Sequence, residues 1–196
     1  MSWIGTYARY PQYRARNGRV DVLEDRINDC FQRSMNGRRL DPASRPMRDI
    51  VAYMAFLSRG IPVGAAVEGS GLPKVETLTG DSIRGSRTFA ARCIRCHGTS
   101  GEGTAVGPPL WGPRSYNIGA GMARVGAFAA FVRQLMPRDS ARTLSTQDAY
   151  DVATFVNSRP RPDFRGKEND WPLGGAPRDI AYPVKSAKGS RAAPAK

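Results

Sequence analysis

Among the 196 residues of this chain, the motif Cys93-Ile-Arg-Cys96-His97 most narrows the folds, cofactors and functions that are possible. Two cysteines at this spacing can each form a thioether with one haem, and the histidine that follows can turn its ring toward the iron. A structural zinc site is less favoured, because zinc prefers four ligands and the third cysteine, Cys30, lies in a distant segment. A redox-active CxxC usually lies between a strand and a helix, and no such context is evident. The motif predicts one covalently attached c-type haem and a role in electron transfer.

The iron of such a haem needs a second axial ligand, and the composition narrows the choice. His97 is the only histidine in the sequence, so this ligand is expected to be a methionine. Met136 follows an expected helix and lies on a loop that could approach the iron, and Met122 is the reserve candidate. The alternative for Met136 is a methionine that fills a gap in the core. A methionine ligand would give a comparatively high reduction potential.

A loop rich in glycine and proline follows the motif and is expected to complete the haem site. Pro108 lies in the sequence Gly-Pro-Pro-Leu-Trp-Gly, and a loop of this kind can place a backbone carbonyl against the outer nitrogen of His97. Trp111 of the same loop is expected to pack on the porphyrin.

Apolar residues recur at helical spacing along most of the chain, and no strand pairs stand out, so we expect an all-α fold with long loops. Helices are expected at about 22–35, from Ser44 to about 60, from about 81 into the CxxCH motif, at about 124–134, and from Ser145 onward. The chain divides into a first globular segment (1–60), a linker (61–79), a second globular segment (80–160) and a tail (161–196). The tail is basic and rich in Pro, Gly and Ala, which is typical of an extended or disordered segment.

The net charge of +13 indicates an anionic partner. Nucleic acid is the least favoured, because no nucleic-acid-binding motif is present. An anionic membrane surface, an acidic redox protein and an anionic substrate remain. No apolar run approaches the roughly 18–20 residues of a membrane span. The N-terminal residues lack the charged and apolar regions of a signal peptide.

The second segment resembles a class I cytochrome c domain. The resemblance covers residues 80–158 and is carried by an N-terminal helix with Gly85 and Phe89, the CxxCH motif, the Gly-Pro-Pro-Leu loop, the Met-Pro pair, and a C-terminal helix with Tyr150 and Phe155. It implies the cytochrome c fold with one haem for residues 80–160, and it is unspecific about the partner.

A narrower resemblance links both segments to the dihaem thiosulfate dehydrogenases. The matching stretches are residues 9–14, 25–37 and 50–53 in the first segment, and 116–117, 119–122, 136–137 and 156–162 in the second. Members of that family have two cytochrome c domains, couple two thiosulfates into tetrathionate and pass two electrons onward. Their first haem is catalytic and has histidine and cysteine as axial ligands. By motif, the resemblance implies Cys30 as this cysteine and Met136 as a ligand of the second haem.

The resemblance also makes the beginning of the chain unusual. In the family the first CxxCH lies upstream of the residue that matches Cys30, at a distance that falls before Met1. We therefore expect an N-terminally truncated member, in which residues 1–60 form a partial first cytochrome c-like domain without its haem-attachment motif. A full-length relative would carry two haems c and an export signal, and the resemblance implies a periplasmic protein.

The neighbourhood of Cys30 is consistent with chemistry on sulfur. Arg26, Cys30 and Ser34 recur at the spacing of one helix face, Arg33 lies close by, and Arg16 is expected to join them. Guanidinium groups favour the thiolate, which is the form that binds iron or attacks sulfur, and they would also hold an oxyanion such as thiosulfate. The alternative is a buried structural cysteine beside a solvated arginine face.

Three functions remain open at this point. The chain is most of a thiosulfate dehydrogenase, with the second haem as an electron relay, or a simple periplasmic electron carrier, or an inactive fragment of the dihaem enzyme. As written it lacks the catalytic haem motif, so its status as an enzyme is undecided.

Overall fold

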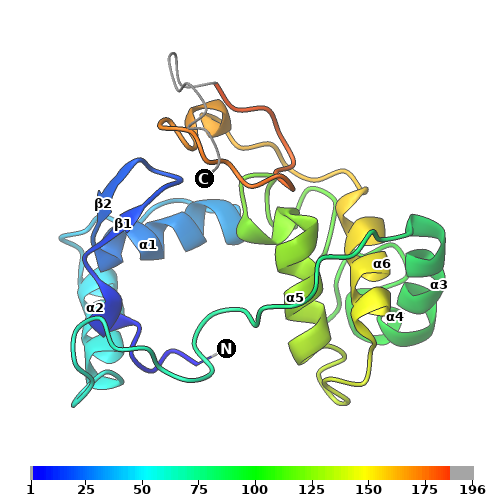
Figure 1. Ribbon diagram of the computed structural model, residues 1–196, viewed down its shortest axis with the longest axis horizontal. Helices are drawn as coiled ribbons and strands as arrows, with labels where there is room; N and C mark the ends of the chain where they lie inside the picture. Colours follow the sequence, from blue (N-terminus) through cyan, green and yellow to red (C-terminus); the bar gives the residue numbers. More distant parts are fainter. Residues whose placement is uncertain (1, 186–196) are drawn as a thin grey trace, which may run out of the picture.

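A short β-hairpin and two helices form the N-terminal lobe of the computed structural model, which describes residues 2–185 (Figure 1). Strands β1 (Gln12–Arg14) and β2 (Arg19–Asp21) pair antiparallel. They are followed by α1 (Leu23–Asp29) and α2 (Arg45–Phe56). The hairpin corrects the expectation of an all-α chain. Three-residue strands are too short to show an alternating pattern in the sequence.

Helix α1 continues into a π-helix, Cys30–Ser34, at the position of the predicted cysteine. The Met35 amide donates to the Cys30 carbonyl at 3.0 Å, a hydrogen bond five residues apart instead of four. Single π turns are rare and often lie at functional sites. The predicted helix at 22–35 is present, but its last turn is wider than an α-helical turn.

The core of the N-terminal lobe is small. Leu23, Ile27, Met47 and Met54 are buried on the facing sides of α1 and α2. The Ser44 side chain accepts a hydrogen bond from the Met47 amide at 3.4 Å and caps α2, as the sequence predicts.

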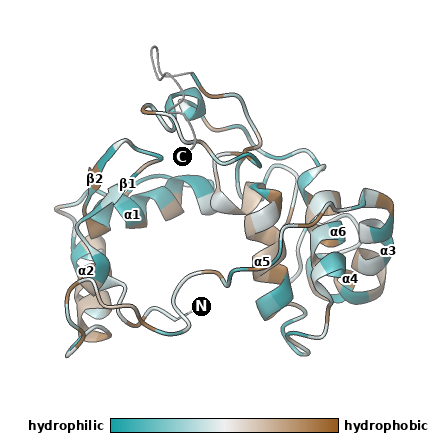
Figure 2. Cartoon of the chain, viewed as in Figure 1, coloured by the Kyte–Doolittle hydropathy of each residue, from teal (hydrophilic) through white to brown (hydrophobic). Residues whose placement is uncertain are grey.

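The C-terminal lobe is built around two crossing helices. Its elements are α3 (Ser82–Arg92), α4 (Ile94–His97), α5 (Val125–Leu135) and α6 (Thr146–Asn157). A Cβ atom at Gly85 of α3 would lie 2.0 Å from the Asp151 carbonyl oxygen of α6, so the close crossing requires glycine there. Much of α5 is apolar (Figure 2), and residues such as Phe128 and Val132 face the core.

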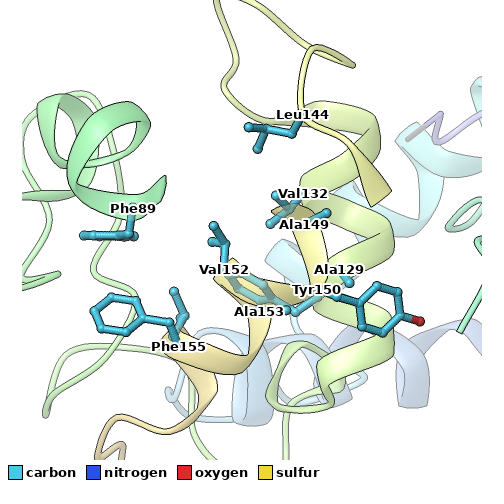
Figure 3. Packing of buried hydrophobic residues seen from close by; sticks show 11 residues of the cluster. Phe89, Ala129, Val132, Leu144, Ala149, Tyr150, Val152, Ala153 and Phe155 are labelled. Atoms are coloured by element: carbon cyan, nitrogen blue, oxygen red, sulfur yellow. The ribbon is translucent and has the colours of Figure 1, made fainter. Parts of the chain in front are cut away.

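Aromatic rings fill the space between α3 and α6 (Figure 3). The Phe89 and Phe155 rings lie with centroids 5.5 Å apart, and Val152 and Ala149 continue this packing along α6. Side-chain caps hold both helix starts. Asp81 accepts hydrogen bonds from the amides of α3, and Ser145 forms a capping box with Asp148 at α6.

The C-terminal segment, defined here as residues 160–185, leaves α6 and returns over the N-terminal lobe (Figure 1). It contains one short 3-10 helix, Lys167–Asn169, and buries Asp170, Trp171 and Tyr182. The Trp171 amide donates to the Arg16 carbonyl at 2.8 Å. Of the two expectations for the tail, extended or disordered, the structure contradicts disorder for residues 161–185, because composition does not reveal such long-range contacts. Residues 186–196 of the predicted tail lie outside the described residues.

Helices long and apolar enough to cross a bilayer are not found within residues 2–185.

Candidate functional site

The CxxCH motif forms a single helical turn at the end of α3. The amides of Cys96 and His97 both donate to the Cys93 carbonyl, at 3.1 and 3.0 Å, so this one carbonyl starts α4. Gly98 then ends the turn with a positive φ of +81°, a conformation that glycine adopts readily. Burial raises the pKa of the free Cys93 thiol to about 11. Before any attachment, this cysteine is therefore a neutral thiol at neutral pH.

The loop after the motif holds the histidine ring, as the sequence predicts. The His97 Nδ1 atom lies 2.8 Å from the Pro108 carbonyl oxygen. A carbonyl can only accept, so Nδ1 carries the proton and Nε2 is left as a free lone pair for a metal. Gly107 allows this approach, because a Cβ atom there would lie 2.3 Å from the Cys96 carbonyl oxygen.

A cavity of about 470 Å³ opens beside the motif. Its lining brings together predicted residues that lie far apart in the sequence: Cys93, Cys96, His97, Pro108 and Met136. Most of the remaining wall is apolar and comes from Phe89, Val106, Leu110, Phe128, Phe131, Val132 and Val152. Volumes of about 300–1,000 Å³ with apolar walls and a few polar groups are typical of cofactor sites. Two thiols, one correctly oriented imidazole and one thioether in an apolar cavity fit a haem c.

The two candidate methionines lie in different surroundings. Met136 follows the last turn of α5 and lines the cavity. Met122 lies outside the lining, in the 3-10 helix Gly121–Ala123, and packs against the core of the lobe. Its carbonyl accepts a hydrogen bond from the Asn157 side chain at 3.1 Å. The geometry favours Met136, and its role as an iron ligand stays a prediction.

Trp111 does not line the cavity, contrary to the expectation that it packs on the porphyrin. Its ring lies behind Phe89, with centroids 5.2 Å apart, and meets the edge of Phe155 at 5.8 Å. Of these three rings, Phe89 is the one that lines the cavity, so Trp111 supports the wall from behind. Sequence reasoning also missed Phe128 and Phe131, although their spacing along α5 is a signal that could have identified them.

The predicted cysteine site in the N-terminal lobe is only partly assembled. The Arg26 Nη1 atom lies 2.8 Å from the Cys30 sulfur, and Cys30 is half-buried at the start of the π-helix. This contact agrees with the predicted helix face. Ser34 is exposed at the other end of the π-helix.

Arg33 and Arg16 were predicted to lie beside Cys30. In the structure their guanidinium groups bind Asp170 and the Gly119 carbonyl instead. Arg33 is buried, and its two terminal nitrogens donate to the two carboxylate oxygens of Asp170, both at 2.8 Å. The Arg16 guanidinium donates to the Gly119 carbonyl at 3.0 Å and stacks over Trp171, with 4.9 Å to the ring centroid. Both arginines therefore join the N-terminal lobe to the rest of the chain, and Arg33 is neutralised by a carboxylate.

Comparisons with known proteins match each lobe to a cytochrome model. Residues 2–63 match the SoxA/TsdA cytochrome c domain, and residues 81–156 match the cytochrome c oxidase, cbb3-type, subunit III model. A thiosulfate dehydrogenase from Allochromatium vinosum is 46% identical over 86% of this chain and 65% of its own length. One from Psychrobacter arcticus is 43% identical over 91% of this chain and 57% of its own length.

A solved structure gives the same result. The thiosulfate dehydrogenase TsdBA from Marichromatium purpuratum, in its as-isolated form, superposes with a TM-score of 0.79 at 39% identity, over 84% of this chain and 38% of that one. The fold and the site thus define a c-type cytochrome. Its cytochrome c domains imply a bound haem c and a role in electron transfer. The chain is similar to thiosulfate dehydrogenases over most of its own length. It spans between about half and two thirds of the length of the curated relatives given above.

Proposed function

We propose that the chain relays electrons through one haem c that is bonded to Cys93 and Cys96, with His97 and Met136 as the axial ligands. The observation that carries the proposal is the cavity that all four side chains line together. The motif occurs once in the sequence, which supports one haem for each chain. A haem held there supplies reversible one-electron transfer. The Pro108 carbonyl fixes the ring of His97, and the apolar wall limits the access of water.

The reaction that this relay would serve is thiosulfate oxidation, because the matched relatives are named thiosulfate dehydrogenases. Two thiosulfate anions form one sulfur–sulfur bond and become tetrathionate, with the release of two electrons. A haem held at this site would supply one-electron transfer, so each turnover would need two passages of an electron through the site. An electron acceptor protein takes them away, and the periplasm is the proposed compartment.

Cys30 is the proposed catalytic ligand in a longer protein that carries a first haem upstream. The contact with Arg26 supports this role, because a guanidinium beside the sulfur can hold an oxyanion such as thiosulfate. In a protein with both haems, Cys30→Ala is expected to abolish tetrathionate formation, measured as thiosulfate-dependent reduction of an acceptor. Val20→Ala is the control in the same lobe, since Val20 is 62% exposed on β2, and it should retain most turnover. Full turnover by the Cys30→Ala protein would refute the role.

A simple electron carrier is the second candidate function. It is favoured by the single CxxCH motif in the sequence. The two candidates differ in their need for Cys30, because a carrier transfers electrons through the haem lobe alone. A carrier with Cys30→Ala should exchange electrons at the wild-type rate.

The haem proposal is tested by two methionine variants of the same size. Met136→Leu is expected to change the haem spectrum and to lower the reduction potential, because a thioether ligand is lost. Met122→Leu is the control and should leave both unchanged, since Met122 lies outside the cavity lining. A pyridine haemochrome assay on the wild type should give one haem per chain. An unchanged spectrum and potential in Met136→Leu would exclude Met136 as the ligand.

A further inference from the structure

Asn117 of the C-terminal lobe contacts the helix that begins at Cys30. Its side-chain amide donates to the Gln32 carbonyl at 2.7 Å, and its backbone amide donates to the Arg33 carbonyl at 3.1 Å. Both carbonyls lie near the end of the π-helix, where a helix leaves its carbonyl groups without internal partners. Asn117 is 1% exposed, so it caps this helix from the other lobe at a place shielded from water.

Tyr116, the preceding residue, extends this contact to the haem cavity. Its ring lies 6.3 Å from the ring of Phe128, centroid to centroid, within the range of an interacting aromatic pair. Phe128 is 5% exposed and lines the cavity. The Tyr116 hydroxyl donates to the Asn157 side chain at 2.9 Å, which holds the ring in this position. Tyr116 and Asn117 therefore join the helix of Cys30 to the cavity wall, and we call these two residues the Tyr-Asn bridge.

Other connections between the π-helix and the cavity are longer. The covalent chain passes through α2 and residues 57–81 before it reaches α3. The Arg33 guanidinium reaches the Gly119 carbonyl at 3.3 Å, but only through a whole side chain, and its pair with Asp170 leads into the C-terminal segment. Electronic coupling falls much faster across a gap between atoms than along covalent and hydrogen bonds. The bridge is therefore the most direct of these connections.

We propose that the Tyr-Asn bridge is the route by which electrons pass from the site of Cys30 to the haem cavity. Thiosulfate is the reductant, and the two electrons of each turnover leave in two such passages. Each passage oxidises the site at Cys30 by one electron and reduces the iron in the cavity by one electron. Within the bridge no bond forms or breaks, and no proton moves. Asn117 and Tyr116 are thus positioning residues, which hold the two sites in electronic contact.

The surroundings of Tyr116 favour passage through its ring without a stop on it. Burial raises the pKa of the Tyr116 phenol to about 12, so the ring is neutral at neutral pH. The Arg161 guanidinium lies over the ring, 4.3 Å from its centroid, within the range of a cation–π contact. The positive charge opposes the loss of an electron from the ring. The ring therefore serves as a medium between the two sites and not as a redox centre of its own.

This role of the bridge rests on the proposed relay function, because the route ends at a haem in the cavity. Haem content, spectrum and reduction potential are therefore measured first in every variant. A wild-type chain that carries no haem contradicts the relay, and the role of the bridge falls with it. The transfer rates below concern the bridge alone and can overturn its role while the relay stands.

A photochemical label measures electron transfer from Cys30 to the haem directly. In the haem-loaded chain Cys30 is the only free thiol, because the sequence has three cysteines and two of them are bonded to haem. A thiol-reactive ruthenium(II) polypyridine complex is attached to it. After a flash, the excited complex reduces the ferric haem by one electron, and haem absorbance gives the rate. The ruthenium(III) form then takes the electron back.

Two variants of Tyr116 separate the effect of the ring from that of its hydrogen bond. Tyr116→Phe keeps the ring and loses the contact with Asn157, whereas Tyr116→Leu loses both. We expect transfer at the wild-type rate in Tyr116→Phe and a several-fold slower rate in Tyr116→Leu. A merely structural role of the hydroxyl would slow both variants alike. Equal rates in the two variants would overturn the proposal.

Asn117→Ala removes the side-chain part of the cap and should also slow the transfer several-fold. Asn28→Ala is the matched control, because Asn28 is a buried asparagine that exchanges hydrogen bonds with the Leu40 backbone, at 3.0 and 2.7 Å. It loses contacts of the same kind outside the bridge, so it should lose stability and keep the wild-type rate. Equal slowing by both variants would overturn the proposal, because lost stability would then explain the effect.

A second label position separates the bridge from the haem site. Ala90 is exposed on α3, and Ala90→Cys in a chain with Cys30→Ser carries the same complex there. From this position Tyr116→Leu and Asn117→Ala should leave the rate unchanged, since the electron does not cross the bridge. Equal slowing from both label positions would overturn the proposal, because the effect would then lie in the haem site.

Discussion

At the scale of single residues, the haem site depends on how closely two backbone segments approach each other. Gly107 lies against the Cys96 carbonyl, and the next residue, Pro108, supplies the carbonyl that orients the ring of His97. The loop thus couples the attachment motif to the orientation of the proposed iron ligand. A side chain at position 107 would separate the two segments and rotate the imidazole.

Gly107→Ala tests this coupling. The new Cβ atom would meet the Cys96 carbonyl oxygen at 2.3 Å, so the loop has to move. We expect a loss of about 1–3 kcal/mol in the free energy of unfolding, together with a shift of the haem potential. Denaturant unfolding and a redox titration measure the two effects. Gly121→Ala is the control, because its Cβ atom would have no neighbour within 4 Å. Equal stability of the two variants would contradict the argument.

The features that the sequence predicts best are those formed by residues close together in the chain. Cys93, Cys96 and His97 form one turn of the chain, and the caps at Ser44 and Ser145 need only the next few residues. The sequence also places Met136 correctly at the end of a helix, beside the cavity. The position of Trp111 behind Phe89 could not be predicted, because it depends on how α3 and α6 cross.

At the scale of elements, one buried carboxylate ties the start of α3 to the middle of α6. Asp151 is 2% exposed. It accepts hydrogen bonds from the Asp81 amide at 2.7 Å and from two nitrogens of Arg84, at 2.7 and 3.0 Å. These contacts fix the helix crossing that carries Phe89 to the haem cavity.

Asp151→Asn should weaken the crossing and change its dependence on pH. Burial alone would raise the pKa of Asp151, but hydrogen bonds from Arg84, Asp81 and Gln147 outweigh it and hold the pKa below the ordinary 3.8. The carboxylate therefore adds stability above about pH 4, and this stability is lost as the pH falls through the lower folded-state pKa. The variant should lose about 2 kcal/mol at pH 7 and less at pH 3.

Denaturant unfolding at both pH values measures this difference. Asp49→Asn is the control, since Asp49 forms an exposed ion pair with Arg45 and should change stability by less than about 1 kcal/mol. A deficit for Asp151→Asn that is equally large at pH 3 and pH 7 would show that the charge is not the cause.

At the scale of the whole molecule, the C-terminal segment connects the two lobes through a buried ion pair. Arg33 and Asp170 lie 137 positions apart in the sequence, which explains why sequence periodicity and composition did not predict their contact. The Tyr182 hydroxyl adds a hydrogen bond to Asp170 at 2.6 Å. Asn117 completes the junction from the haem lobe, because its amide donates to the Arg33 carbonyl at 3.1 Å. The π-helix that begins at Cys30 is thereby fixed relative to the haem lobe.

Asp170→Asn should release the C-terminal segment from the N-terminal lobe. It removes the two 2.8 Å contacts of the buried Arg33 guanidinium and leaves this group only the longer ion pair with Asp29, at 3.5 Å, which costs about 3 kcal/mol. Trypsin should then cleave the segment at the exposed Arg165 at least about tenfold faster than in the wild type, while the haem spectrum stays unchanged. Asp163→Asn is the control in the same segment, because Asp163 is 72% exposed and pairs with Lys167 at the surface. If both variants resist trypsin as the wild type does, the buried pair does not hold the lobes together, and the position of Cys30 depends instead on the contacts of Asn117.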